Sequence, residues 1–139
     1  MIEALENLAK INQLKKEPFD QAEFNGMLMA AKIKLQDARL DGLSKDSQFT
    51  LSYGAAHALS VAALRWHGYR SDNRYIVFQC LQHTIGFSNA QWRVLDQCHQ
   101  KRNVAEYEGH LDINEALLKE LLKLSRLLYE KVSSLRIKI

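Results

Sequence analysis

The sequence predicts an all-α fold, an up-and-down bundle of four to five long helices preceded by a short N-terminal helix. The 139 residues contain one proline and six glycines, too few turn-forming residues for an all-β fold. Apolar residues recur every three or four positions along most of the chain, which is the period of an amphipathic helix. Hydrophobic residues make up 47% of the chain, enough for one packed domain over residues 1–139.

The first two helices are predicted on either side of a proline. Residues 1–16 contain the short N-terminal helix, which ends before Pro18 because the residue preceding a proline is pushed out of the α region. The second helix runs from Asp20 to about residue 40. Its start carries two recognisable signals, a capping-box-like pair and a hydrophobic staple: Asp20 with Glu23, and Phe19 with Phe24.

The middle of the chain predicts one long and one shorter helix. The long one covers about residues 45–67, begins at Ser44 or Asp46, and stops at Gly68. Its many small residues would let another helix approach its backbone closely. The shorter helix covers about residues 73–85 and ends near Gly86.

Two further helices complete the bundle. Ser88 and Gln91 form a capping box that opens a helix to about residue 108, and Asp112 with Glu115 gives a similar signal for the last helix. The apolar face of that last helix repeats at spacings of four and three: Ile113, Leu117, Leu121, Leu124, Leu128, Val132 and Leu135.

The first residues do not have the pattern of a secretory signal, and no apolar run approaches the roughly 20 residues that cross a bilayer. Cys80 and Cys98 lack the spacing of a metal site and are too few for a disulfide framework. We therefore expect a cytoplasmic protein with no membrane partner.

The formal net charge is +3, but the basic residues are unevenly placed. Between residues 60 and 105, six basic residues against two acidic ones leave a charge of +4, and histidines and aromatic residues lie among them. Cations and aromatic rings together suit RNA, whose phosphates need positive charge and whose bases need flat partners. Alternatively, these side chains face different ways on separate helices. The basic residues are Arg65, Arg70, Arg74, Arg93, Lys101 and Arg102.

One face of the helix from Ser88 begins apolar and becomes polar in its second half. Arginine, asparagine, glutamate and histidine on one face could hold a phosphate and move a proton. The alternative is a helix that emerges from the core into solvent, with Arg102 and Glu106 as an ion pair. The residues of this face are Trp92, Leu95, His99, Arg102, Asn103, Glu106 and His110.

Metal and cofactor sites have weaker support. His99, Glu106 and His110 could line up along one helix, but the sequence has no HExxH pair and no second ligand cluster. No phosphate-binding glycine loop, dinucleotide fingerprint or GxSxG elbow occurs either. We expect neither a metal nor a cofactor.

Three short motifs resemble the HEPN-domain family over about residues 20–132. They are Tyr-Gly-Ala-Ala-His-Ala-Leu from Tyr53, Gly-Tyr-Arg from Gly68, and Lys-Arg-Asn-Val-Ala-Glu-Tyr-Glu from Lys101. The chain is most similar to a bacterial subgroup whose late helix carries Arg-Asn-x-x-Glu-Tyr. The resemblance implies a homodimer with the motif helices facing across a cleft. Many members are metal-independent ribonucleases, often toxins paired with a nucleotidyltransferase antitoxin.

The family's active motif is an arginine and a polar residue, with a histidine after four to six intervening positions. Arg102 and Asn103 match its start, whereas Tyr107 follows after four intervening residues and His110 after seven. Arginine can stabilise the developing charge on phosphorus, but tyrosine, with an ordinary pKa of about 10, is a poor base. His110 or His99 could replace the missing base.

The candidate catalytic residues are therefore Arg102, which matches the family motif, and His110, which lies outside its spacing and would replace the missing base. His99, Asn103, Glu106 and Tyr107 would line the binding cleft. Whether the chain cleaves RNA or only binds RNA or nucleotides stays open. It could instead be a non-catalytic partner of a nucleotidyltransferase, with a tyrosine such as Tyr107 modified, or a purely structural dimer.

Overall fold

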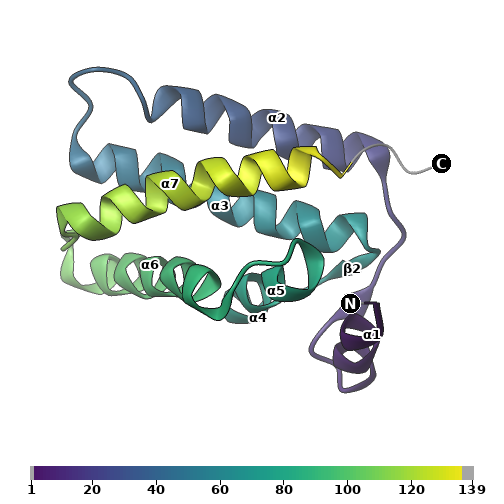
Figure 1. The fold of residues 1–139 in the computed structure, drawn as a ribbon. Coiled ribbons are helices and arrows are strands. Elements are labelled where there is room, and N and C mark those ends of the chain that lie inside the picture. Colours follow the sequence, from purple (N-terminus) through teal and green to yellow (C-terminus); the bar gives the residue numbers. More distant parts are fainter. Residues whose placement is uncertain (1, 136–139) are drawn as a thin grey trace.

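Four long helices form the bundle in this computed structural model, which describes residues 2–135 (Figure 1). The central helix, α3, packs most extensively against α2 and α7, and it also contacts α4 and α6. The predicted all-α bundle with a short N-terminal helix is confirmed. Met1 and residues 136–139, which the predicted domain includes, lie outside the described residues. The long helices are α2 (Gln21–Asp37), α3 (Lys45–Trp66), α6 (Asn89–Glu108) and α7 (Glu115–Ser133).

Side-chain caps fix most helix starts where the sequence predicts them. The Asp20 carboxylate accepts the backbone N–H groups of Ala22 and Glu23 at 2.9 and 3.2 Å. Ser88 and Gln91 form both halves of a capping box at the start of α6. Each such cap satisfies backbone donors that lack a partner in the first turn.

The start of α7 differs from the prediction. Its cap is Asn114, whose side chain accepts the N–H of Leu117 at 2.7 Å, and Asp112 lies in the preceding loop. Asparagine caps a helix as well as aspartate does, so the sequence offers two closely spaced starts. The helix begins at the second of them.

The predicted helix over residues 73–85 is two short helices, α4 (Arg74–Gln79) and α5 (Leu81–Thr84). They meet at Cys80, whose side chain is completely buried. Six- and four-residue helices are too short to persist alone, so packing against the bundle holds them.

The N-terminal helix α1 (Ile2–Lys10) is also shorter than predicted, because Asn12 adopts a left-handed conformation with φ 64°. The chain then forms a two-residue strand, β1 (Lys15–Lys16), which pairs antiparallel with β2 (Tyr69–Arg70). Strands this short leave no periodic pattern in the sequence. The pairing joins the N-terminal segment to the end of α3.

Buried side chains form two clusters. The larger fills the space between the long helices and includes Phe24, Phe49, Leu59 and Leu121. The smaller lies under α1, where Leu5 is completely buried. The small residues of α3 do allow a close approach. A side chain at Gly54 would meet the aliphatic part of Lys34 on α2 at 3.4 Å.

Within residues 2–135, the structure contains no helix with both the length and the apolar character needed to span a membrane.

Candidate functional site

A hydrogen-bonded chain of polar side chains joins α3, α4 and α6. Its centre is Tyr53 on α3, whose side chain is buried. Arg74 on α4 donates to the Tyr53 hydroxyl at 2.8 Å, and Nδ1 of His99 on α6 lies 3.1 Å from the same oxygen. Asn103, one turn further along α6, lies 3.3 Å from Nε2 of His99. We call these residues, with His57 and Arg102, the Tyr53 cluster.

Two arginines approach the Tyr53 ring from different helices. The guanidinium carbons of Arg74 and Arg102 lie 5.7 and 5.6 Å from the ring centroid, within the range of a cation–π contact. Arg102 also faces Glu106 at 3.8 Å, but both side chains are substantially exposed, so this ion pair is weak. Among the described residues, no carboxylate forms a salt bridge with Arg74. The cluster therefore carries excess positive charge.

Aromatic packing holds the two imidazoles beside Tyr53. The rings of His57 and His99 lie nearly parallel to the Tyr53 ring, at 13° and 10°, with centroids 6.5 and 6.4 Å away. Phe78 on α4 contacts Tyr53 and His57 edge-on. These contacts restrict the positions of the three rings.

Both imidazoles of the cluster are neutral at pH 7. Burial and the positive charges of Arg74 and Arg102 lower the pKa of His57 from 6.5 to about 4. Burial and Arg74 also lower the pKa of His99, although Asp96 and Glu106 oppose this shift. Burial raises the pKa of Tyr53 above its ordinary value, despite the opposing effect of Arg74, so the hydroxyl keeps its proton.

The hydrogen-bond pattern couples the Tyr53 hydroxyl to His99 and Arg74. The Tyr53 oxygen accepts from Arg74. The side-chain amide of Asn103 contacts Nε2 of His99, and the donor and acceptor roles of His99 towards Tyr53 and Asn103 follow from its tautomer. In one tautomer Nδ1–H donates to the Tyr53 oxygen, and in the other the Tyr53 hydroxyl donates to Nδ1.

Space for a ligand lies next to Arg102. A cavity of about 240 Å³ opens between the start of α3 and the end of α6, and its wall includes Phe49, Thr50, Arg102 and Glu106. Phe49 stacks on Tyr53, with ring centroids 6.1 Å apart, so the cavity adjoins the Tyr53 cluster.

The structure brings together four of the six predicted site residues: His99, Arg102, Asn103 and Glu106. It does not bring Tyr107 or His110 to them. Tyr107 is 92% exposed, and five residues from Arg102 correspond to about 140° around a helix. His110 follows Gly109, which ends α6 at φ 78°, and it faces Glu108 at 3.9 Å.

Three cluster residues were not predicted as site residues: Tyr53, His57 and Arg74. The sequence does contain a signal for two of them. Tyr53 and His57 are polar aromatic residues one turn apart on a helix face that otherwise carries small and apolar side chains. Arg74 gave no such signal, because its position depends on how α4 docks.

The basic residues between positions 60 and 105 divide into different environments. Arg65 is buried and pairs with Glu23 at 2.7 Å, while Arg70 pairs with Glu17 and Asp72 at the surface. Arg93 lies over Trp92, 5.4 Å from its ring. The interpretation that these cations face different ways holds for these three. Arg74 and Arg102 are the two that converge on Tyr53.

Across residues 2–135, no group of three His, Cys, Asp or Glu side chains is arranged to hold a metal ion. Comparison with protein-family models, curated proteins and solved structures finds no match for this chain. The Tyr53 cluster is therefore identified from its geometry and charge alone.

Proposed function

We propose that this chain is a HEPN-type homodimeric protein that binds RNA or nucleotides through a phosphate group at the Tyr53 cluster. One observation carries the proposal: Arg74 and Arg102 converge on a single tyrosine, and among the described residues Glu106 is the one carboxylate that forms a salt bridge with either of them. Two guanidinium groups match the oxygens and charge of a phosphate. The neutral imidazoles add no fixed charge, so the two arginines set the affinity.

The geometry favours binding over cleavage. Metal-free RNA cleavage needs a base that takes the proton of the 2′-hydroxyl as its oxygen attacks phosphorus, and an acid that protonates the departing 5′-oxygen. His99 is neutral, as a base must be, but both of its ring nitrogens are engaged, Nδ1 with Tyr53 and Nε2 with Asn103. Cleavage through His99 therefore requires Asn103 to turn away when the substrate binds.

The homodimer is part of this proposal, because the HEPN resemblance implies motif helices that face each other across a cleft. Exposed apolar side chains on α6 support it: Val104 is 48% and Tyr107 92% exposed. A partner copy would cover this surface. Light scattering should give twice the mass of the chain, and Val104→Asp should reduce it towards the monomer.

The direct test is RNA binding and cleavage by the purified protein in EDTA. Arg102→Ala and Arg74→Ala should each weaken binding of a short single-stranded RNA at least tenfold while leaving the helical content unchanged. Arg93→Ala, which removes a cation lying on Trp92, is the matched control and should have less than a twofold effect. Equal effects of all three variants would contradict a site at the Tyr53 cluster.

Cleavage by the wild type but not by Arg102→Ala would extend the proposal to a metal-independent ribonuclease. If neither protein cuts RNA and binding depends on Arg102, the chain is a binding module. If Arg102→Ala instead lowers stability or dimerisation without affecting RNA, the polar face of α6 is structural.

In a second candidate function, the chain is the non-catalytic partner of a nucleotidyltransferase in a toxin–antitoxin-like pair. The exposed Tyr107 hydroxyl supports it, since an enzyme could reach this atom. In such a step the oxygen attacks the α-phosphorus of a nucleoside triphosphate, the Tyr107 proton leaves, and pyrophosphate is released. A neighbouring nucleotidyltransferase gene would favour this candidate, and labelling lost in Tyr107→Phe would test it.

A further inference from the structure

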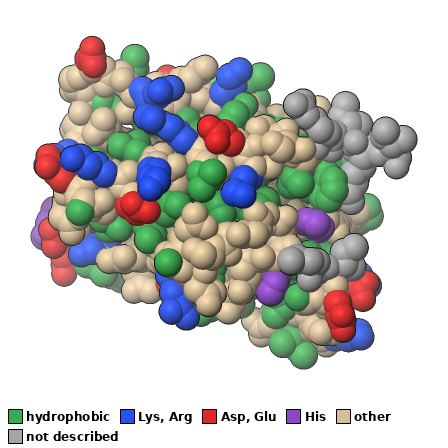
Figure 2. Space-filling view, viewed as in Figure 1, with side chains coloured by type: hydrophobic (Ala, Val, Ile, Leu, Met, Phe, Trp, Pro, Cys, Tyr) green, Lys and Arg blue, Asp and Glu red, His purple; other side chains and the backbone are tan. Residues whose placement is uncertain are grey.

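A second charged surface lies between α2 and α7, away from the Tyr53 cluster. There the two helices form a groove of about 450 Å³ whose walls carry three cations, Lys32, Arg39 and Arg126. Glu130 is the one carboxylate among the residues that line it, and Tyr129 adds an aromatic ring. Figure 2 shows several Lys and Arg side chains over α2 and α7 on this face, with Asp and Glu side chains among them.

The cations lie on both walls of the groove. Lys32 is on α2, and Arg39 lies in the turn that follows the end of this helix at Asp37. On α7, Lys119 precedes Arg126 by seven residues and is also exposed. The α7 wall therefore presents exposed cations at a two-turn interval, and α2 with the turn after it supplies Lys32 and Arg39 on the opposite wall.

The carboxylates of α2 lie away from this groove. Glu23 pairs with the buried Arg65 on α3. Asp37 follows Lys32 by five residues, which places it about 140° away around the helix. The wall formed by α2 is therefore cationic and unopposed by acidic side chains of its own helix.

We propose that the groove between α2 and α7 binds the sugar–phosphate backbone of single-stranded RNA. A groove with repeating cations and an aromatic ring suits an extended polynucleotide, whose phosphates follow the cations while a base stacks on the ring. Tyr129, which is partly exposed, gives the groove a feature that an acidic peptide would not need. The choice of RNA as ligand rests on the proposed function.

The groove and the Tyr53 cluster are separate sites. They share no residue, since α2 and α7 line the groove, and α3, α4 and α6 supply the cluster. In Figure 1, α2 and α7 run along the upper part of the bundle and α4 and α6 along the lower part. A short RNA can occupy only one of the sites, whereas the groove gives a longer strand additional contacts.

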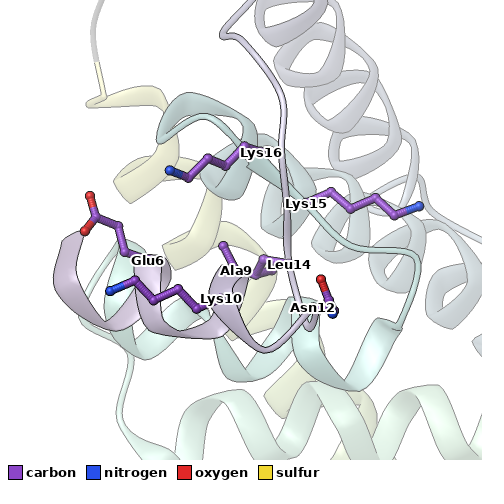
Figure 3. A pocket seen from close by; sticks show the side chains of 7 residues that line it. All are labelled: Glu6, Ala9, Lys10, Asn12, Leu14, Lys15 and Lys16. Carbon is purple, nitrogen blue, oxygen red and sulfur yellow. The ribbon is translucent and has the colours of Figure 1, made fainter.

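The N-terminal segment offers a matched control. Lys10, Lys15 and Lys16 line a cavity of about 430 Å³ beside α1, so it also carries three cations. Figure 3 shows Lys15 pointing away from Lys10 and Lys16, with Glu6 on the same side as Lys10. Replacing these lysines changes the net charge as much as replacing the groove cations does. The N-terminal lysines, however, do not form a continuous cationic wall.

The experiment compares two triple variants, Lys32→Gln/Arg39→Gln/Arg126→Gln and Lys10→Gln/Lys15→Gln/Lys16→Gln. Each is titrated with a single-stranded RNA of about 20 nucleotides and with a trinucleotide. The groove variant should bind the long RNA at least tenfold more weakly, with a salt slope smaller by about 2, the value for three phosphate contacts on a single strand. Its trinucleotide affinity should not change. The control variant should differ less than twofold from wild type.

Equal losses in both triple variants, or an unchanged affinity of the groove variant for the long RNA, would overturn the groove proposal. The groove proposal would also be overturned if the groove variant bound RNA normally but lost a tight interaction of the wild type with an oligoglutamate peptide. That result would assign the groove to an acidic protein. Arg102→Ala and Arg74→Ala separate this proposal from the first. If they leave RNA binding intact and the groove variant weakens it, the Tyr53 site fails and the groove stands.

Discussion

The hydroxyl oxygen of Tyr53 lies 3.1 Å from Nδ1 of His99, a residue 46 positions later in the chain. This contact joins α3 to α6 at the place where α6 leaves the core. The same oxygen accepts from Arg74, so one buried hydroxyl group orients side chains from two other helices. Removing it should affect both stability and ligand binding.

Tyr53→Phe keeps the ring and removes this oxygen. We expect a loss of about 1–2 kcal/mol in the free energy of unfolding, because Arg74 and His99 each lose a hydrogen bond. Phosphate affinity should fall as well, since the hydroxyl oxygen that positions Arg74 is gone. Urea unfolding and calorimetric titration would measure the two effects. Tyr75→Phe is the control, because Tyr75 packs against Trp92 outside the cluster. An equal effect of both substitutions would contradict this account.

His57 should make the fold sensitive to acid. Its folded-state pKa of about 4 lies below the ordinary value of 6.5, so the unfolded chain binds a proton that the folded chain does not. Stability therefore falls as the pH drops from 6.5 to 4, by an amount on the order of 1 kcal/mol for a partly exposed group. His57→Gln should reduce this loss. Urea unfolding midpoints at pH 7.5, 6, 5 and 4 would measure the loss of stability. An equal decrease of the midpoint with pH in the wild type and in His57→Gln would contradict the prediction.

Glu106 competes with any anion for Arg102, which it faces at 3.8 Å. Glu106→Gln should therefore increase phosphate affinity up to about fivefold, the equivalent of a surface ion pair of at most 1 kcal/mol. Glu108→Gln, two residues along the same helix, changes the net charge equally but removes the partner of His110. A similar gain in the control would mean that net charge alone determines the affinity.

Arg65 should matter for stability and not for RNA. It is 3% exposed, and it donates to the carbonyl oxygens of Glu17 and Pro18 at 2.9 and 2.6 Å besides pairing with Glu23. Arg65→Ala should cost about 3 kcal/mol in unfolding free energy, as expected when one partner of a buried ion pair is removed. RNA affinity at a temperature where the variant is folded should stay within twofold. A selective loss of RNA binding would place Arg65 in the binding surface.

The two cysteines should be unreactive in the folded protein. Burial raises the pKa of Cys80 and Cys98 to about 12, and neither side chain is exposed. A maleimide reagent at pH 7 reacts with the thiolate, so labelling should follow unfolding. Ala90→Cys, at an exposed position near the start of α6, provides the reactive control. Fast labelling of either native cysteine would show local opening of the core.

Local signals predicted the four long helices because their ends and faces are determined nearby in the sequence. The Ser88–Gln91 capping box and the Phe19–Phe24 staple, with ring centroids 5.8 Å apart, lie where the sequence predicts them. The break at Cys80 and the β1–β2 pair could not be predicted. Both depend on contacts between segments that are distant in sequence, and neither has a pattern of its own.

The candidate site was predicted in part for the same reason. His99, Arg102, Asn103 and Glu106 lie within two turns of one helix, so helical periodicity alone groups them. Arg74 joins them from another helix, and its placement depends on tertiary packing. His110 was grouped with them on the assumption that the helix continues, but the left-handed Gly109 ends α6 before it.

The two arginines of the Tyr53 cluster belong to helices of very different length and stability. Arg102 belongs to the 20-residue helix α6, whereas Arg74 begins the six-residue helix α4, which the buried side chains of Ile76, Val77 and Phe78 hold in place. Detachment of α4 exposes far less surface than global unfolding does, so its free energy is smaller. The fraction of molecules able to bind with both arginines is then set by this local equilibrium, and the apparent affinity decreases by the same fraction.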